Sequence, residues 1–230
     1  EWAANEKVAL EVCAGASMAG ARSICCMKHV GLNVASDPLY TLAYTGVNGG
    51  LVVVVADDPG MHSSQNEQDS RMHARGSQVP MLEPSDSDEC RAFTKLAFEL
   101  SEKYDTPVFV RTTTRVAHAR SVVHPQERVE AALKPYQKDI SKWVMMPGMA
   151  KGRHVVVEKR MNDLAKDASS LPVNRVEMGD TKIGVICSGM AYQYVKEVAP
   201  EISVLKLGIV NPLPMDLIAD FARQVETLYV

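Results

Sequence analysis

Residues Leu51–Ala56 read Leu-Val-Val-Val-Val-Ala, an unbroken run of apolar side chains. A strand with one face in water alternates apolar and polar residues, so a run without alternation indicates a strand that is covered on both faces. Such strands are typical of parallel sheets, in which crossover helices lie on either side. The run therefore predicts a buried strand of an α/β protein.

The segments on both sides of this run repeat a strand–helix alternation. Right-handed β-α-β units and a parallel sheet produce this order of elements. The predicted strands are 24–27, 51–56, 79–82, 107–111, 183–187 and 203–207, and the predicted helices are 5–20, 37–46, 84–104, 151–166, 191–198 and 215–225.

Two of the helices carry more specific signals. Asp37 followed by Pro38 predicts an N-cap and a first helical position, and Gly46 predicts the end of that helix. The helix over 5–20 has small or branched residues at helical spacing, which predicts a buried helix at a tight interface. These residues are Val8, Val12, Cys13, Ala16 and Ala19.

The alternation is interrupted once, which indicates two domains. We expect a first domain over 1–114, a long structured connection over 115–179, and the start of a second α/β domain over 180–230. The chain begins without Met and stops within the apolar run Leu228-Tyr229-Val230. We therefore expect a fragment that is incomplete at both ends.

Composition excludes several classes of protein. The 230 residues are 46% hydrophobic and 23% charged, with a net charge of -3. They contain no apolar run near the ~20 residues of a membrane span and no block of five basic residues, so neither a membrane nor a nucleic acid is an expected partner. The five cysteines form no C-x-x-C pair, which indicates reduced thiols in a cytoplasmic protein without its own zinc or iron–sulfur ligands. A thiol that joins a site on another chain stays an open alternative.

Common nucleotide and hydrolase motifs are absent. The glycine cluster 46–50 follows a predicted helix and precedes a strand, whereas a dinucleotide-binding G-x-G-x-x-G follows a strand and opens a helix. The sequence has no phosphate loop, no G-x-S-x-G elbow and no H-E-x-x-H. A Rossmann-type oxidoreductase is therefore disfavoured.

Polar residues follow two of the predicted strands, where ligands gather in open α/β sheets. His29 lies in a predicted loop, 28–31, after the first strand, and His62, Gln65 and Asn66 come after the second. Simpler explanations exist for each: His29 as a loop histidine with satisfied hydrogen bonds, and the run 62–69 as a solvated surface loop. An acid such as Glu6 in a first helical turn commonly complements the helix dipole.

Three stretches favour a functional explanation over these simpler ones: 5–11 (NEKVALE), 27–34 (MKHVGLNV) and 56–69 (ADDPGMHSSQNEQD). Together with 82–85 (LEPS), 111–115 (RTTTR) and 208–214 (GIVNPLP), they occur in the order found in the thiamine-diphosphate-dependent 2-oxoacid:ferredoxin oxidoreductases. The sequence most resembles the alpha subunits of the enzymes that oxidise indolepyruvate. Because the resemblance runs in order through most of the chain, chance similarity of one motif does not explain it.

This resemblance implies a fold for each part of the chain. Residues 1–114 would form most of a parallel-sheet pyrimidine-binding domain, and 180–230 would begin a transketolase C-terminal-like domain. The family's Mg²⁺-binding G-D-G motif with its downstream asparagine is not present, since Gly179-Asp180-Thr181 lacks the second glycine. Mg²⁺ and the [4Fe-4S] clusters are therefore expected from regions outside this sequence.

The resemblance also implies roles for individual residues. Glu6 matches the glutamate that hydrogen-bonds N1′ of the cofactor's aminopyrimidine and so promotes removal of the thiazolium C2 proton. His29, Val30 and Gly31 match the segment that packs beside the pyrimidine.

The loop after the second strand corresponds to the family's loop near the thiazolium and the substrate. It carries His62, Gln65 and Asn66, and we expect His29 and His62 to act as hydrogen-bond donors that orient the substrate carboxylate or the developing oxyanion. Relatives that act on pyruvate have an arginine near the position of Asp57 or Asp58. Its absence is compatible with an aryl pyruvate held by apolar packing.

The implied activity is oxidative decarboxylation of an aryl pyruvate, such as indolepyruvate, with coenzyme A. The products would be an aryl acetyl-CoA and CO₂, with electrons passing to ferredoxin in an oxygen-poor cytoplasm. A beta subunit, and hence a hetero-oligomer, is expected. The alternatives are a different 2-oxo acid, or a non-catalytic subunit whose small-residue helix only docks a partner.

Overall fold

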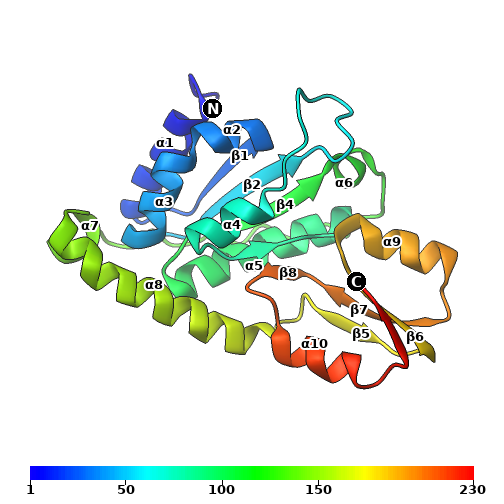
Figure 1. Ribbon diagram of the computed structural model, residues 1–230. Coiled ribbons are helices and arrows are strands. Elements are labelled where there is room, and N and C mark those ends of the chain that lie inside the picture. Colours follow the sequence, from blue (N-terminus) through cyan, green and yellow to red (C-terminus); the bar gives the residue numbers. More distant parts are fainter.

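A computed structural model describes residues 1–230 and shows two sheets flanked by helices (Figure 1). The first sheet is parallel except for its last strand, and its order is β1 (Ser23–Lys28), β2 (Leu51–Asp57), β4 (Val108–Thr113), β3 (Met81–Leu82) and β8 (Ile209–Asn211). The second sheet has the order β5 (Arg175–Glu177), β7 (Ile202–Leu207), β6 (Asp180–Ser188) and β9 (Thr227–Tyr229). In the second sheet β6 pairs in parallel with both β7 and β9, while β5 is antiparallel.

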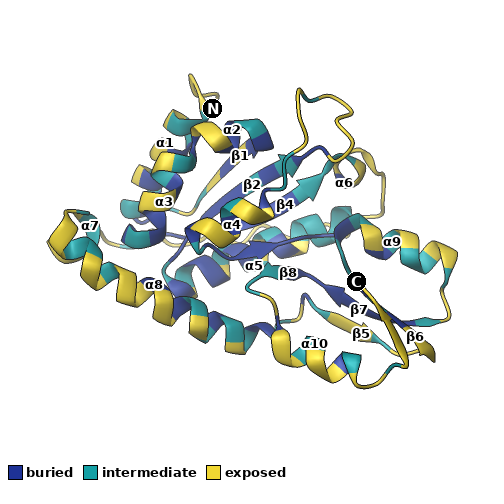
Figure 2. Ribbon diagram, in the orientation of Figure 1, coloured by how far each residue is buried: buried dark blue, intermediate teal, exposed yellow.

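Strand β2 confirms the prediction from its apolar run. Val53 and Val55 join a core with α1 (Glu6–Met18) and α3 (Ser36–Thr45), while Val52 joins the core under α5 (Ser87–Tyr104). Successive side chains of a strand point to opposite faces, so both faces of β2 are buried. Figure 2 shows this buried centre and the exposed outer faces of the helices.

The remaining helices connect or cover these sheets. They are α2 (His29–Val34), α4 (Arg71–Ser77), α6 (Thr114–His118), α7 (Ile140–Trp143), α8 (Pro147–Ala168), α9 (Gly189–Val198) and α10 (Met215–Ala222). The predicted alternation is therefore confirmed, and β5, β8 and the short helices α2, α4, α6 and α7 are additions to it.

Two predictions about the helices are wrong, one about the buried face of α1 and one about the N-cap of α3. The stripe Val8–Ala19 on α1 is not the buried face: Leu10, Ala14 and Ser17 are buried, whereas Val12 is 62% exposed. The reason is that α1 packs onto β1, an edge strand, so only one side of the helix is covered.

Asp37 is not an N-cap. Helix α3 begins one residue earlier, at Ser36, and Asp37 lies in its first turn. The chain passes from α2 into α3 through Ala35 without the extended backbone that a capping aspartate requires. Gly46 does end α3, with a positive φ of 71°.

Residues 115–179 are anchored to the first sheet through Asp105. Its carboxylate accepts from Lys142 at 2.6 Å, from Arg153 at 2.9 Å and from the backbone N–H of Val47 at 2.9 Å. The buried guanidinium of Arg160 donates to the Asp105 carbonyl. Strand β8, from beyond residue 180, also pairs with β3. The domain boundaries at 114 and 180 stay a prediction.

Asp105→Asn should lower the free energy of unfolding by about 2 kcal/mol, the scale for hydrogen bonds to charged groups. Asparagine keeps the left-handed backbone of this residue, φ 53°, and removes only the charge. Asp163→Asn, in the exposed pair with Lys159, is the control and should cost less than about 0.5 kcal/mol. Equal urea midpoints for Asp105→Asn and the control would contradict this role.

Candidate functional site

Glu6 is the first residue of α1, and its carboxylate has no hydrogen-bond partner in this chain. The Asn5 side chain caps the helix by accepting from the Val8 N–H at 3.0 Å, so the capping role is already filled. Glu6 is half-buried, and no group of this chain donates a hydrogen bond to its carboxylate. As an acid in the first turn, Glu6 complements the helix dipole without serving as the cap.

Gly31 lets the Glu6 side chain lie against α2. A Cβ at Gly31 would stand 2.4 Å from Glu6 Cγ and 2.7 Å from Glu6 Oε1, closer than any real Cβ contact. The predicted loop at 28–31 is wrong, because α2 begins at His29 directly after β1. A glycine inside this short helix is explained by the close approach of the carboxyl group.

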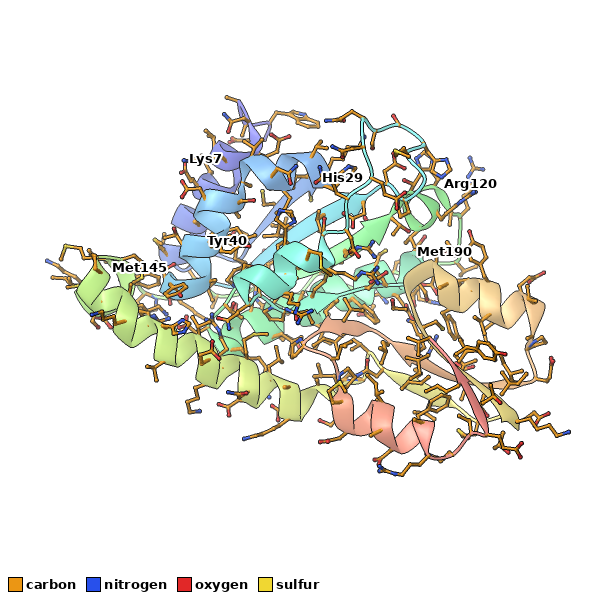
Figure 3. All side chains as sticks on the ribbon, viewed as in Figure 1. Lys7, His29, Tyr40, Arg120, Met145 and Met190 are labelled. Atoms are coloured by element: carbon orange, nitrogen blue, oxygen red, sulfur yellow. The ribbon has the colours of Figure 1, made fainter.

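His29, labelled in Figure 3, is fully buried with half of its hydrogen-bonding capacity unused. Nδ1 lies 3.4 Å from the carbonyl oxygen of Ala56, and Nε2 has no partner. Buried polar atoms are rarely left unpaired, because the lost hydration is not recovered. The simpler explanation of a fully satisfied histidine is therefore wrong. With Nδ1–H donated to Ala56, neutral His29 presents Nε2 as an acceptor.

Asp58 organises the loop between β2 and α4. Its carboxylate accepts from the N–H groups of His62 and Ser63 at 3.2 and 2.8 Å, and from the hydroxyls of Ser64 and Thr114 at 2.7 and 2.6 Å. These hydrogen bonds, first that of Thr114, hold the pKa of Asp58 well below its usual range. Asp58 is therefore a structural anion rather than a proton carrier.

The loop places His62, Gln65 and Asn66 in solvent. All three are exposed, and none forms a hydrogen bond with Glu6 or His29. The amino group of Lys28 donates to the carbonyl of Ser63, which holds the loop beside the start of α2. The structure thus brings Glu6 and Gly31 together, and His29 lies two residues before Gly31 at the start of α2, with half-buried Val30 between them. The predicted substrate roles of the three loop residues stay predictions.

Arg111 is a buried charged residue, at the base of the loop between β2 and α4, to which the sequence interpretation gave no role. Its Nε lies 2.7 Å from Asp57 Oδ2 and its Nη1 2.7 Å from Glu83 Oε1, and all three side chains are buried. Asp57 also accepts from the N–H of Ser70 at 2.9 Å, so it ties both ends of the loop to β4. A charge inside the apolar strand 108–113 was the available signal.

The carboxyl of Glu83 is only partly satisfied. Its Oε2 has no hydrogen-bond partner, and burial raises the pKa of Glu83 despite the attraction of Arg111. No group of three or more His, Cys, Asp or Glu side chains is placed to hold a metal ion.

The groups without hydrogen-bond partners are chemically compatible with an aminopyrimidine. A flat nitrogen heterocycle can pair with a free carboxylate, with a glycine that leaves room for that carboxylate, and with a buried imidazole nitrogen that has no partner. The family described as "Pyruvate flavodoxin/ferredoxin oxidoreductase, thiamine diP-bdg" matches residues 2–171. The chain belongs to this family.

Curated relatives of this thiamine-diphosphate-binding family match the whole chain. It is 46% identical to indolepyruvate oxidoreductase subunit IorA of Methanothermobacter thermautotrophicus, and 40% identical to the protein of that name from Archaeoglobus fulgidus. Each alignment covers 100% of this chain and 38% of the relative, so the chain spans well under half the length of these relatives. The predicted resemblance is confirmed.

Solved structures support the fold. A 2-oxoglutarate:ferredoxin oxidoreductase from Magnetococcus marinus aligns with a TM-score of 0.73 at 16% identity, over 98% of this chain and 48% of that one. A split-gene transketolase aligns with a TM-score of 0.60 at 14% identity, over 97% of this chain and 61% of that one. The predicted fold class is confirmed. None of the helices has the length and apolar character needed to cross a bilayer.

Asp58→Asn should release the loop 59–66. A carboxylate whose pKa is lower in the folded protein than in the unfolded chain stabilises the folded state fully above its ordinary pKa of about 4. This stabilisation is lost as the pH falls through the pKa of the folded protein. In the unmodified protein, protection of the loop should therefore persist to about pH 4 and disappear only in stronger acid. Hydrogen exchange, corrected for intrinsic rates, measures this protection.

Glu67→Gln is the matched control on the same loop, since Glu67 accepts from only the Gly60 N–H, at 2.7 Å. It should change loop protection far less than Asp58→Asn. Equal losses in the two variants at pH 7 would show that Asp58 does not organise the loop.

Proposed function

We propose that this chain forms part of a thiamine-diphosphate-dependent oxidoreductase that oxidatively decarboxylates indolepyruvate or another aryl pyruvate. Coenzyme A would take up the acyl group, giving aryl acetyl-CoA and CO₂, and two electrons would pass singly to ferredoxin. The observation that carries the proposal is the Glu6 carboxylate lying on Gly31 near the start of α2, which also carries the unpartnered Nε2 of His29. The names of the relatives support the choice of substrate.

Glu6 would hold N1′ of the aminopyrimidine and keep a proton shared with it. A carboxylate without a cationic partner in its own chain is free to exchange that proton, which an amide cannot do. When bound, thiamine diphosphate supplies the nucleophilic carbon and the electron sink for decarboxylation.

While its imidazole is neutral, His29 would position the ligand by accepting a hydrogen bond rather than by donating one. The contact of Nδ1 with the Ala56 carbonyl leaves Nε2 as an acceptor for a donor on the ligand, and donation to an oxyanion would require the imidazolium form. Gln65 and Asn66 would reach the substrate by movement of the exposed loop beyond Ser64, whereas His62, whose N–H is held by Asp58, would do so by rotation of its side chain.

The rest of the enzyme would come from outside these residues. A beta subunit in a hetero-oligomer, Mg²⁺, and [4Fe-4S] clusters that pass electrons to ferredoxin complete the proposal, in an oxygen-poor cytoplasm. The exposed Val12 on α1 and Ile24 on the edge strand β1 support contact with another segment or chain at this side. The same surface is what a non-catalytic pairing subunit would use.

Glu6→Gln in the complete enzyme should lower turnover about 10²-fold or more, on the scale of acid–base groups. Glutamine keeps the shape of the side chain, so thiamine diphosphate should still bind. Glu11→Gln, an exposed acid on the same helix, is the control and should turn over normally.

Near-normal turnover of Glu6→Gln would overturn the catalytic role of Glu6. Absence of thiamine diphosphate binding in the complete, unmodified protein would favour the pairing-subunit alternative instead. The two outcomes are measured separately, by ferredoxin reduction and by titration calorimetry.

Gly31→Ala should weaken thiamine diphosphate binding about tenfold or more, because the added methyl group displaces the Glu6 carboxyl. Gly15→Ala on α1 is the control, since a Cβ there meets nothing within 4 Å. The control should bind normally and gain about 0.5–1 kcal/mol of stability from its higher helix propensity. Unchanged cofactor affinity in Gly31→Ala would show that Glu6 does not need this approach.

A further inference from the structure

Lys28 carries a positive charge that no acid of this chain pairs with. It is the last residue of β1 and directly precedes His29, the first residue of α2. The residue is half-buried, and its amino group donates to the carbonyl of Ser63 but forms no ion pair. An ammonium group has three N–H donors, so two are free for a ligand.

The register of the sheet places Lys28 beside the groups of the candidate cofactor site. Lys28 stands opposite Ala56 in the pairing of β1 with β2, and the Ala56 carbonyl oxygen lies 3.4 Å from Nδ1 of His29. Gly31, against which the Glu6 side chain lies, follows Lys28 by three residues, which is about one turn of helix. Lys28 and the start of α2 therefore belong to the same part of the molecule.

The contact with Ser63 brings the Lys28 amino group up to the loop after β2. Ser63 lies between His62 and Ser64, and all three residues donate hydrogen bonds to Asp58. Figure 1 shows α2 and this loop at the same edge of the first sheet. This is the carboxyl edge of the parallel strands, where open α/β sheets bind ligands.

The acids of this loop do not neutralise Lys28. Each of them accepts hydrogen bonds from other groups: Asp57, Asp58, Glu67 and Asp69. A half-buried charge without a counter-ion favours an anion from outside the chain.

Glu6 and His29 are both unsuited to a substrate carboxylate. Glu6 is itself an acid, and neutral His29 presents Nε2 as an acceptor. A 2-oxo acid carries its carboxylate directly beside the reacting carbonyl, so a site for such a substrate needs a donor or a cation there. Lys28 supplies both.

We propose that Lys28 binds the carboxylate of the 2-oxo acid substrate. This inference rests on the proposed function and names the cation that its substrate requires. Ser63 would hold the ammonium group in place while the two free N–H groups reach the carboxylate. When CO₂ leaves, the electron pair of the broken C–C bond stays with the remaining carbon, so the carboxylate loses its charge. Lys28 would therefore contribute to KM more than to kcat.

Titration calorimetry of the complete enzyme with its partner subunit, saturated with thiamine diphosphate, tests this role with indole-3-propionate and its uncharged amide. The acid has the length of indolepyruvate without the reacting carbonyl. The unmodified enzyme should bind the acid about tenfold or more tightly than the amide, on the scale of hydrogen bonds to charged groups. Lys28→Gln should abolish this preference by weakening only the acid. Lys95→Gln, at an exposed lysine of α5, is the matched control and should keep the preference.

Ferredoxin reduction with indolepyruvate gives the second measurement. Lys28→Gln should raise KM about tenfold or more with a much smaller change in kcat, and thiamine diphosphate should bind as in the unmodified enzyme.

Equal affinities of the acid and the amide in the unmodified enzyme, or no saturable binding of either, would overturn the role of Lys28. Equal weakening of both probes in Lys28→Gln would also overturn it, because Lys28 would then only hold the loop through Ser63. Absence of indolepyruvate turnover by an unmodified enzyme that keeps the preference for the acid would overturn the proposed function alone.

Discussion

The buried guanidinium of Arg111 connects the loop after β2 with the start of α9. It stands on β4, at the centre of the first sheet, and pairs with Asp57 at the base of the 57–70 loop and with Glu83 next to α9. Removing three charges from water is costly, and their mutual attraction offsets this cost only when the geometry is good. Arg111 therefore constrains how the loop and the start of α9 lie relative to the sheet, whatever its net contribution to stability.

The elements that the sequence predicted well are those governed by local pattern. The Leu51–Ala56 run and the predicted strand 203–207 both form strands whose residues are buried or half-buried. Asp86 caps α5 by accepting from the Glu89 N–H at 2.8 Å. In these elements the apolar pattern and the end signals agree, and such agreement is what makes a local prediction reliable.

The elements that were predicted wrongly depend on neighbours that are distant in sequence. Val12 has the spacing of a buried residue, but the sheet ends at β1 and nothing in this chain covers that side. His29 and Gly31 were assigned to a loop but lie in α2, where the packing of the Glu6 side chain leaves room only for glycine at position 31. For the site, resemblance pointed to Glu6, His29 and Gly31, but the Asp57–Arg111–Glu83 chain became evident only from tertiary contacts.

The same packing arrangement occurs once in each half of the chain, in different surroundings. In each case a carboxyl group is pressed onto a glycine in the first turns of a helix that directly follows a strand: Glu6 onto Gly31, and Glu83 onto Gly189. What differs is the surroundings, because Glu83 is buried against Arg111 while Glu6 is half-buried without a cation. A carboxyl that is held by a guanidinium is fixed in place, whereas one without such a partner can exchange a proton with a ligand. Burial and pairing, rather than residue type, thus distinguish the two carboxyls: Glu83 is held in the fold by Arg111, whereas Glu6 has the free carboxylate that its proposed role requires.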